Sequence, residues 1–203
     1  MDQFHTESYP EENLEWEPDS PRGWGGFRRF LIDLLETVLM ALVLFLAINA
    51  VSARIRVESI SMQPTLFAGD FVIVNKVAYK LGSPERGDII VFRFPPDPER
   101  EPYIKRVVGL PGDRIAVANG RVYINDQPVI EPYIKAPPNY EMPEMVIPEN
   151  ELFVLGDNRN NSSDSHHWGT VPMEYVIGKA EVVYWPPSEW QVLNEQTAVA
   201  ADS

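Results

Sequence analysis

The chain has 203 residues, a formal net charge of −13 at pH 7 and no cysteine. The lack of cysteine excludes a disulfide framework, which neither supports nor excludes an exported domain. The charge is uneven, because residues 1–20 contain seven acidic side chains and neither lysine nor arginine. We expect residues 1–26 to be an acidic disordered tail, either a solvated spacer or a segment that binds something basic. Its acidity argues against nucleic acid or anionic lipid as its partner.

An apolar segment of membrane-spanning length follows the tail. We expect residues 27–52 to be a transmembrane anchor, with an uninterrupted apolar part from Val38 to Ile48. Asp33 and Glu36 interrupt its first turns, so a short amphipathic helix or the buried helix of a soluble protein is the alternative. The positive-inside rule gives only a slight bias toward a cytoplasmic N-terminus, because arginines flank the segment on both sides, at Arg22, Arg28, Arg29, Arg54 and Arg56.

Short strands and turns dominate the chain after the anchor. Apolar runs predict strands at residues 71–77, 88–94, 114–124, 151–155 and 178–185. The Asn119-Gly120 pair predicts a hairpin with a type I′ turn. Two proline-rich stretches predict extended loops, at residues 94–102 and 128–148. We therefore predict a mainly β protein: one N-terminal transmembrane helix, then a coiled antiparallel, barrel-like sheet over residues 53–190 and a C-terminal tail over 191–203.

Two polar blocks in the β region carry candidate chemistry. The segment Ser59-Ile-Ser-Met-Gln-Pro-Thr-Leu66 places Ser61 in a turn, and Tyr103-Ile-Lys-Arg-Val places Lys105 between apolar neighbours. A serine hydroxyl needs a base within reach, and a lysine can serve if burial keeps it neutral. Strand alternation puts Lys105 and Arg106 on opposite faces, so we expect only one of these cations to be buried. Lys105 is the better base, because arginine does not lose its proton.

A third block, Gly156-Asp-Asn-Arg-Asn-Asn-Ser-Ser-Asp-Ser-His-His-Trp-Gly169, is a dense polar loop. In this order, and over roughly residues 28–186, the three blocks resemble the type I signal peptidases. The resemblance implies that Ser61 is the nucleophile and Lys105 the general base. It also implies an oxyanion hole formed by the Ser59 hydroxyl and the Ser61 amide.

The same resemblance assigns supporting roles around the serine and lysine. Ser162 stands where the family has a hydroxyl that orients the lysine. A supporting network would comprise Asp164 with its neighbours Asp157, Asn158 and Arg159. His166 stands where bacterial members often have arginine, so we expect His166 or Arg159 to take over part of the pairing with Asp164.

The resemblance further implies a membrane-bound serine endopeptidase that removes signal peptides from exported preproteins. It would cut after small residues at Ala-x-Ala-like sites through an acyl-enzyme, with its catalytic domain on the trans side of the bilayer. An extended substrate would pair with strand edges near Ser59 and Tyr103. Apolar candidates for the substrate pockets are Ile60, Met62, Ile104 and Val91. The expected partners are signal peptides and membrane lipid, with no nucleic acid, metal or cofactor.

Other functions are compatible with parts of the sequence. A Ser-His-Asp triad could use Ser61 with His166 or His167, although adjacent histidines on a strand would point apart. A zinc site is disfavoured, because adjacent histidines without cysteine match no common ligand spacing, and no phosphate-binding or dinucleotide motif is present. A self-cleaving repressor could share the Ser/Lys pair, but the apolar anchor argues against it. A membrane-anchored β domain that only binds extended peptides would need no competent Ser61.

Overall fold

The computed structural model describes residues 23–193 and 199–200 of the chain. Most of the expected acidic tail, residues 1–22, therefore lies outside the described residues. The chain divides into two compact units at the Phe45–Leu46 bond.

The helix α1 runs from Gly23 to Val51, which agrees with the expected anchor. Its Gly26–Val51 portion has a mean hydropathy of 2.5 and is long and apolar enough to cross a membrane. At a rise of about 1.5 Å per residue, such a helix exceeds the hydrocarbon thickness of a bilayer, about 30 Å. Large apolar side chains are exposed along it, from Phe27 to Val51. Length and composition thus fit a membrane span.

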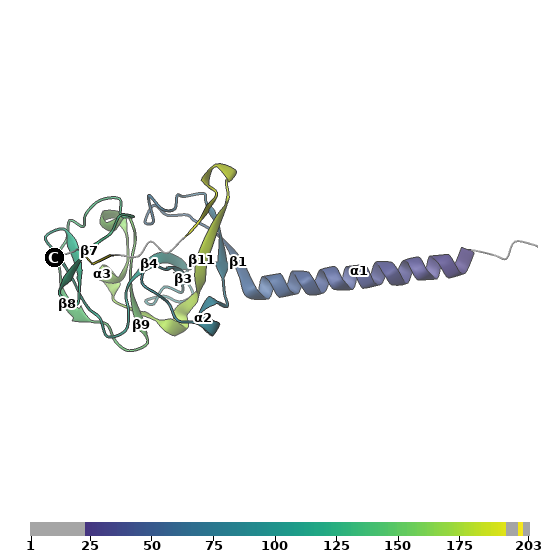
Figure 1. Cartoon of the computed structure of the whole chain (residues 1–203), viewed down its shortest axis with the longest axis horizontal. Helices are drawn as coiled ribbons and strands as arrows, with labels where there is room; N and C mark the ends of the chain where they lie inside the picture. Colours follow the sequence, from purple (N-terminus) through teal and green to yellow (C-terminus); the bar gives the residue numbers. More distant parts are fainter. Residues whose placement is uncertain (1–22, 194–198, 201–203) are drawn as a thin grey trace, which may run out of the picture. The chain divides into compact units, whose positions relative to one another are not determined.

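The rest of the described chain is mainly antiparallel β structure, as predicted (Figure 1). The larger sheet has eight described strands in the order β1-β2-β11-β3-β4-β9-β10, with β12 also paired to β11. Their bounds are β1 Ser52–Arg56, β2 Phe71–Asn75, β3 Ile89–Phe92, β4 Tyr103–Gly109, β9 Glu151–Leu155, β10 Val171–Pro172, β11 Val176–Trp185 and β12 Gln191–Val192.

The smaller sheet has five described strands in the order β13-β7-β6-β5-β8. Their bounds are β5 Arg114–Ala118, β6 Arg121–Ile124, β7 Gln127–Ile130, β8 Met142–Val146 and β13 Val199–Ala200. The remaining elements are short helices: α2 Ala78–Leu81, α3 Ser165–Trp168 and 3-10 turns at Arg159–Asn161, Met173–Tyr175 and Pro187–Glu189.

The predicted hairpin is confirmed, and two expected irregular stretches contain strands. Asn119 and Gly120 join β5 to β6 with φ angles of 52° and 71°, the positive values that a type I′ turn requires. The proline-rich stretch 128–148 was expected to be a loop, but it contains β8 and most of β7. Pro143 is tolerated because β8 is an edge strand. Beyond residue 190, β12 pairs with β11 and β13 with β7, so part of the expected C-terminal tail joins the sheets.

Strand β4 lies inside the larger sheet and has side chains buried on both faces. It pairs with β3 on one side and with β9 on the other. Every β4 residue from Ile104 to Gly109 is buried. Val107 belongs to one apolar cluster, whereas Ile104 and Val108 belong to two others. Any polar side chain on this strand must therefore be neutralised or paired inside the protein.

Candidate active site

Ser61 occupies a turn that follows β1 and is fixed by contacts with the polar loop after β9. The Asn158 backbone N–H donates to the Ser61 carbonyl at 2.9 Å, and Asn158 Nδ2 donates to the Ile60 carbonyl at 3.1 Å. Met62 and Leu66 are fully buried and anchor the turn in the core. These contacts hold Ser61 in place, and the residue is 5% exposed.

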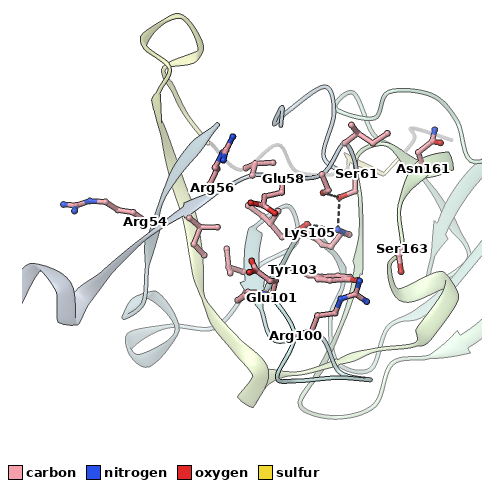
Figure 2. Close-up of a pocket in the computed structure, with 17 residues that line it drawn as sticks. Arg54, Arg56, Glu58, Ser61, Arg100, Glu101, Tyr103, Lys105, Asn161 and Ser163 are labelled. Carbon is pink, nitrogen blue, oxygen red and sulfur yellow. Dashed lines mark hydrogen bonds between the residues drawn. The ribbon is translucent and has the colours of Figure 1, made fainter. Parts of the chain in front are cut away.

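Lys105 reaches this serine from β4. Its Nζ lies 2.8 Å from Ser61 Oγ, the distance of a hydrogen bond (Figure 2). Nζ also donates to the Ile104 carbonyl at 3.0 Å and lies 5.1 Å from the centroid of the Tyr103 ring. Two segments far apart in sequence thus bring a hydroxyl and an amine into direct contact.

The surroundings of Lys105 favour its neutral form. The residue is 3% exposed and forms no ion pair with a carboxylate in the part of the chain that the structure describes. Burial lowers the Lys105 pKa to about 8, and the negative charges of Asp164 and Asp157 oppose that shift. About a tenth of this lysine is therefore unprotonated at pH 7, far more than for an ordinary lysine, and this fraction is able to accept a proton.

Ser59 lies beside Ser61. Its Oγ lies 3.1 Å from Ser61 Oγ, and the residue is exposed at the cleft. A hydroxyl in this position is close to where a substrate carbonyl would meet Ser61 Oγ, as a donor to a developing oxyanion must be.

Arg106 is buried as well, so the expectation that only one of the two cations would be buried is wrong. It is 1% exposed, and its guanidinium binds both carboxylate oxygens of Asp157, at 2.9 and 2.8 Å. It also donates to the Gly87 carbonyl at 2.8 Å and lies 4.1 Å from the centroid of the Tyr133 ring. The two side chains alternate along β4 as expected, but both faces of the strand are covered, and Asp157 compensates the second charge.

Asp164 is fully buried and connects the polar loop to the serine turn. Its Oδ2 accepts from the Gly156 N–H at 2.9 Å, and its Oδ1 lies 2.5 Å from His166 Nδ1. A Cβ on Gly156 would lie 2.5 Å from the Ser61 carbonyl oxygen, so only glycine permits this close packing. Of the two expected partners of Asp164, His166 makes the contact, whereas Arg159 pairs with Glu131.

Ser162 lies close to the Ser61 turn and has no hydrogen bond to Ser61 or Lys105. Its Oγ is buried and has no hydrogen-bond partner among the described residues. A Cβ on Gly156 would be 2.3 Å from this oxygen, which places Ser162 against the same backbone that packs on Ser61. The expected contact between Ser162 and Lys105 is thus not formed in this structure.

A cleft of about 680 Å³ contains Ser61 and Lys105. One wall is formed by residues 54–61 and the other by residues 100–105 (Figure 2). The candidate pocket residues that line it are Ile60, Val91, Tyr103 and Ile104. Met62 differs from the expectation, because its side chain is fully buried in the core and is not part of the cleft wall.

The two histidines lie on α3 rather than on a strand, and they do not point apart. Their ring centroids are 3.6 Å apart. Among the described residues, neither histidine has a hydrogen bond to Ser61, so the geometry of a Ser-His-Asp triad is not formed. Ligand atoms of Asp164, His166 and His167 lie within 4.8 Å of one another and could hold a metal ion. Two of these three groups, Asp164 and His166, already contact each other closely.

Several residues of the site were not identified from the sequence. Glu131 forms a buried ion pair with Arg159, and Thr65 Oγ1 donates to Asp157 Oδ2. Tyr133 covers the Arg106 guanidinium. Glu131 and Tyr133 come from the proline-rich stretch, which has no periodicity to indicate burial. The sequence offered one signal for such partners: Arg106 follows Lys105 in an apolar strand, and an arginine buried there needs a counter-ion.

Comparison with known proteins assigns the chain to a family. Residues 31–185 match the family model described as signal peptidase, peptidase S26. The chain is 44% identical over 161 residues to a probable signal peptidase I-2 of Synechocystis sp., covering 76% of this chain and 73% of that protein. It is 45% identical over 164 residues to a signal peptidase I of Leptolyngbya laminosa, covering 77% and 80% respectively.

A solved signal peptidase I of Enterococcus faecalis is 31% identical, with a TM-score of 0.41 over 47% of this chain and 95% of that chain. The family match spans most of the chain, including all three polar blocks, and the relatives are matched over more than two thirds of their length. The chain therefore belongs to the signal peptidase family, peptidase S26.

Proposed function

We propose that this protein is a membrane-bound serine endopeptidase that removes signal peptides from exported preproteins with a Ser61–Lys105 dyad. The observation that carries the proposal is the 2.8 Å contact between Lys105 Nζ and Ser61 Oγ in a buried setting. A lysine whose pKa burial lowers to about 8 can act as a base for an adjacent hydroxyl.

In the proposed reaction Lys105 accepts and releases one proton in each of two steps, acylation and deacylation. Neutral Lys105 takes the Ser61 hydroxyl proton as Oγ attacks the scissile carbonyl carbon, and the resulting ammonium gives that proton to the leaving amine. The ester formed on Ser61 is then attacked by water, which gives a proton to Lys105. Collapse of the second tetrahedral intermediate returns the proton to Ser61 and releases the carboxylate product. Ser59 Oγ and the Ser61 N–H stabilise the oxyanion in both steps.

The cleft suits an extended peptide. Its two walls, residues 54–61 and 100–105, run beside the dyad, so a substrate could lie between them and pair with their backbones. Ile60, Tyr103 and Ile104 would line pockets next to Ser61. These pockets would admit small side chains, as the Ala-x-Ala-like cleavage sites implied by the family require.

The anchor belongs to the same proposal. Helix α1 would cross the bilayer once, with the N-terminus in the cytoplasm and the catalytic domain on the trans side. Membrane lipid and the signal peptides of preproteins would then be the partners of this protein. Tethering the dyad beside the bilayer that holds its substrates raises their effective concentration.

The test is cleavage of a preprotein in detergent by the wild-type protein, Ser61→Ala, Lys105→Ala and His167→Ala, with the cut site read by mass spectrometry. The proposal expects cuts after small residues, lost in the first two variants and retained in the third. Cleavage that survives without Lys105 would contradict the dyad. A folded wild-type protein that binds the preprotein without cleaving it would instead indicate a peptide-binding domain.

A further inference from the structure

His166 packs against two other rings. Its ring centroid lies 3.9 Å from that of Tyr140, with the rings nearly parallel at 9°, and 3.6 Å from that of His167. Its side chain is 8% exposed. An imidazole packed in this way has little rotational freedom, so Nδ1 is held toward Asp164 Oδ1 at 2.5 Å.

Asp164 also binds the backbone that packs against the Ser61 turn. Its other carboxylate oxygen accepts from the Gly156 N–H at 2.9 Å. Gly156 packs directly on the Ser61 carbonyl and on the Ser162 side chain, where a Cβ would clash. The two oxygens of one buried carboxylate therefore join His166 to the backbone that packs against the nucleophile.

We propose that His166 is a positioning residue of the peptidase: by donating to Asp164 it fixes this carboxylate and draws its negative charge away from Lys105. The groups that face His166 are Asp164, Tyr140 and His167, and the carboxylates that act on Lys105 are Asp164 and Asp157. The charge of Asp157 is already met by Arg106. Asp164 is therefore the carboxylate whose influence on the base depends on His166.

The direction of the effect follows from the charges. The Asp164 carboxylate favours protonated Lys105, because the two charges are opposite. Removing the donor that shares the Asp164 charge strengthens this attraction and raises the pKa of Lys105. Loss of the His166 donor should therefore move the acidic limb of the activity profile to higher pH.

A pair of substitutions separates the hydrogen bond from the ring stacking. His166→Asn keeps an N–H donor near the position of Nδ1 but removes the ring, whereas His166→Phe keeps a ring against Tyr140 but removes the donor. We would measure kcat/KM against pH for each full-length variant in detergent with a signal-peptide substrate. Thermal unfolding would check that both are folded, and His166→Leu would replace the phenylalanine variant if that variant does not fold.

We expect His166→Phe to shift the acidic limb upward by about one pH unit and His166→Asn to stay near the wild-type profile. A shift in the asparagine variant alone would show that stacking matters rather than the donor, and would overturn the inference. Unchanged profiles in both variants would overturn it as well.

The inference rests on the proposed function, so a second readout separates their failures. The pH dependence of acetylation of Lys105, read by peptide mass spectrometry, reports its protonation without requiring turnover. A wild-type protein that cleaves nothing would refute the proposed function. An acetylation midpoint shifted upward in His166→Phe but not in His166→Asn would still support the link from His166 to Lys105, and identical midpoints in all three proteins would refute that link.

Discussion

Lys105 and Arg106 are neighbours on β4, and both are almost completely buried, yet their surroundings are opposite in character. Lys105 contacts a hydroxyl, a carbonyl and the face of an aromatic ring. Arg106 binds both oxygens of a fully buried carboxylate and a backbone carbonyl. Burial without a paired charge produces a weakly basic amine, whereas burial with a bidentate partner preserves a permanent cation. The difference between the proposed base and a structural ion therefore lies in the counter-ion rather than in the depth of burial.

The largest effect is expected when position 105 carries a side chain that cannot lose its proton. Lys105→Arg should lower kcat by about 10³-fold or more, because general-base catalysis is lost while positive charge is kept. The measurement is preprotein cleavage at pH 8. The matched control is Arg106→Lys, which keeps the charge beside Asp157 and should retain most of the activity. Comparable losses in the two variants would contradict the assignment of different roles.

The Arg106 side of the comparison predicts a large effect on stability. Arg106→Met leaves Asp157 buried without its counter-ion, which typically costs 3–5 kcal/mol, so the free energy of unfolding should fall by about that much. Denaturant unfolding of the full-length protein in detergent measures it. The double variant Arg106→Met/Asp157→Leu removes both charges and should recover much of the loss. A double variant as unstable as the single one would show that the ion pair is not the cause.

Part of this arrangement could be predicted from the sequence. Ser61 beside Pro64 and Lys105 in an apolar strand are ordinary turn and strand residues when taken alone, and only the three blocks together, in the order of a known family, pointed to this pair. The strands with apolar runs and the Asn119-Gly120 turn were also predictable, since their signals are local.

The second half of the site depends on contacts between distant segments. The burial of Arg106 depends on Asp157, 51 residues away, and the pairing of Arg159 depends on Glu131, 28 residues away. Strand β8 contains Pro143 and exposed positions, and only its pairing with β5 makes it a strand. The burial of Met62 likewise follows from how the serine turn packs, which no periodicity in Ser59–Leu66 indicates. Tertiary pairing decided these features.

A smaller effect, of opposite sign, tests whether Lys105 lacks a compensating charge. Its folded-state pKa of about 8 lies below the ordinary value of 10.5, so the unfolded chain binds more protons between these pH values. Wild-type stability should therefore rise with pH from about 8 to 10.5. Below that window the penalty is on the order of 3 kcal/mol, and Lys105→Met should be more stable than wild type by up to this amount.

Denaturant unfolding at pH 7, 9 and 10.5 measures the difference between Lys105→Met and wild type. The difference should shrink as pH rises, and the lost contacts with Ser61 and Ile104 will reduce it at every pH. Lys135→Met, at an exposed lysine, is the matched control and should give a difference that does not follow this trend. Lower stability of Lys105→Met at pH 7 would mean that the lysine is stabilised by its surroundings after all.

The smallest effect is expected at an ion pair that shares the chemistry of Arg106 but not its burial. Arg114 contacts Asp126 and Glu144, and the three side chains are 44%, 68% and 51% exposed. Water and salt screen such pairs, so Arg114→Ala should change the free energy of unfolding by less than about 0.5 kcal/mol. The same denaturant assay, repeated at high salt, measures it. A loss as large as that of Arg106→Met would mean that burial does not govern the value of an ion pair here, and the contrast between the two faces of β4 would lose its physical basis.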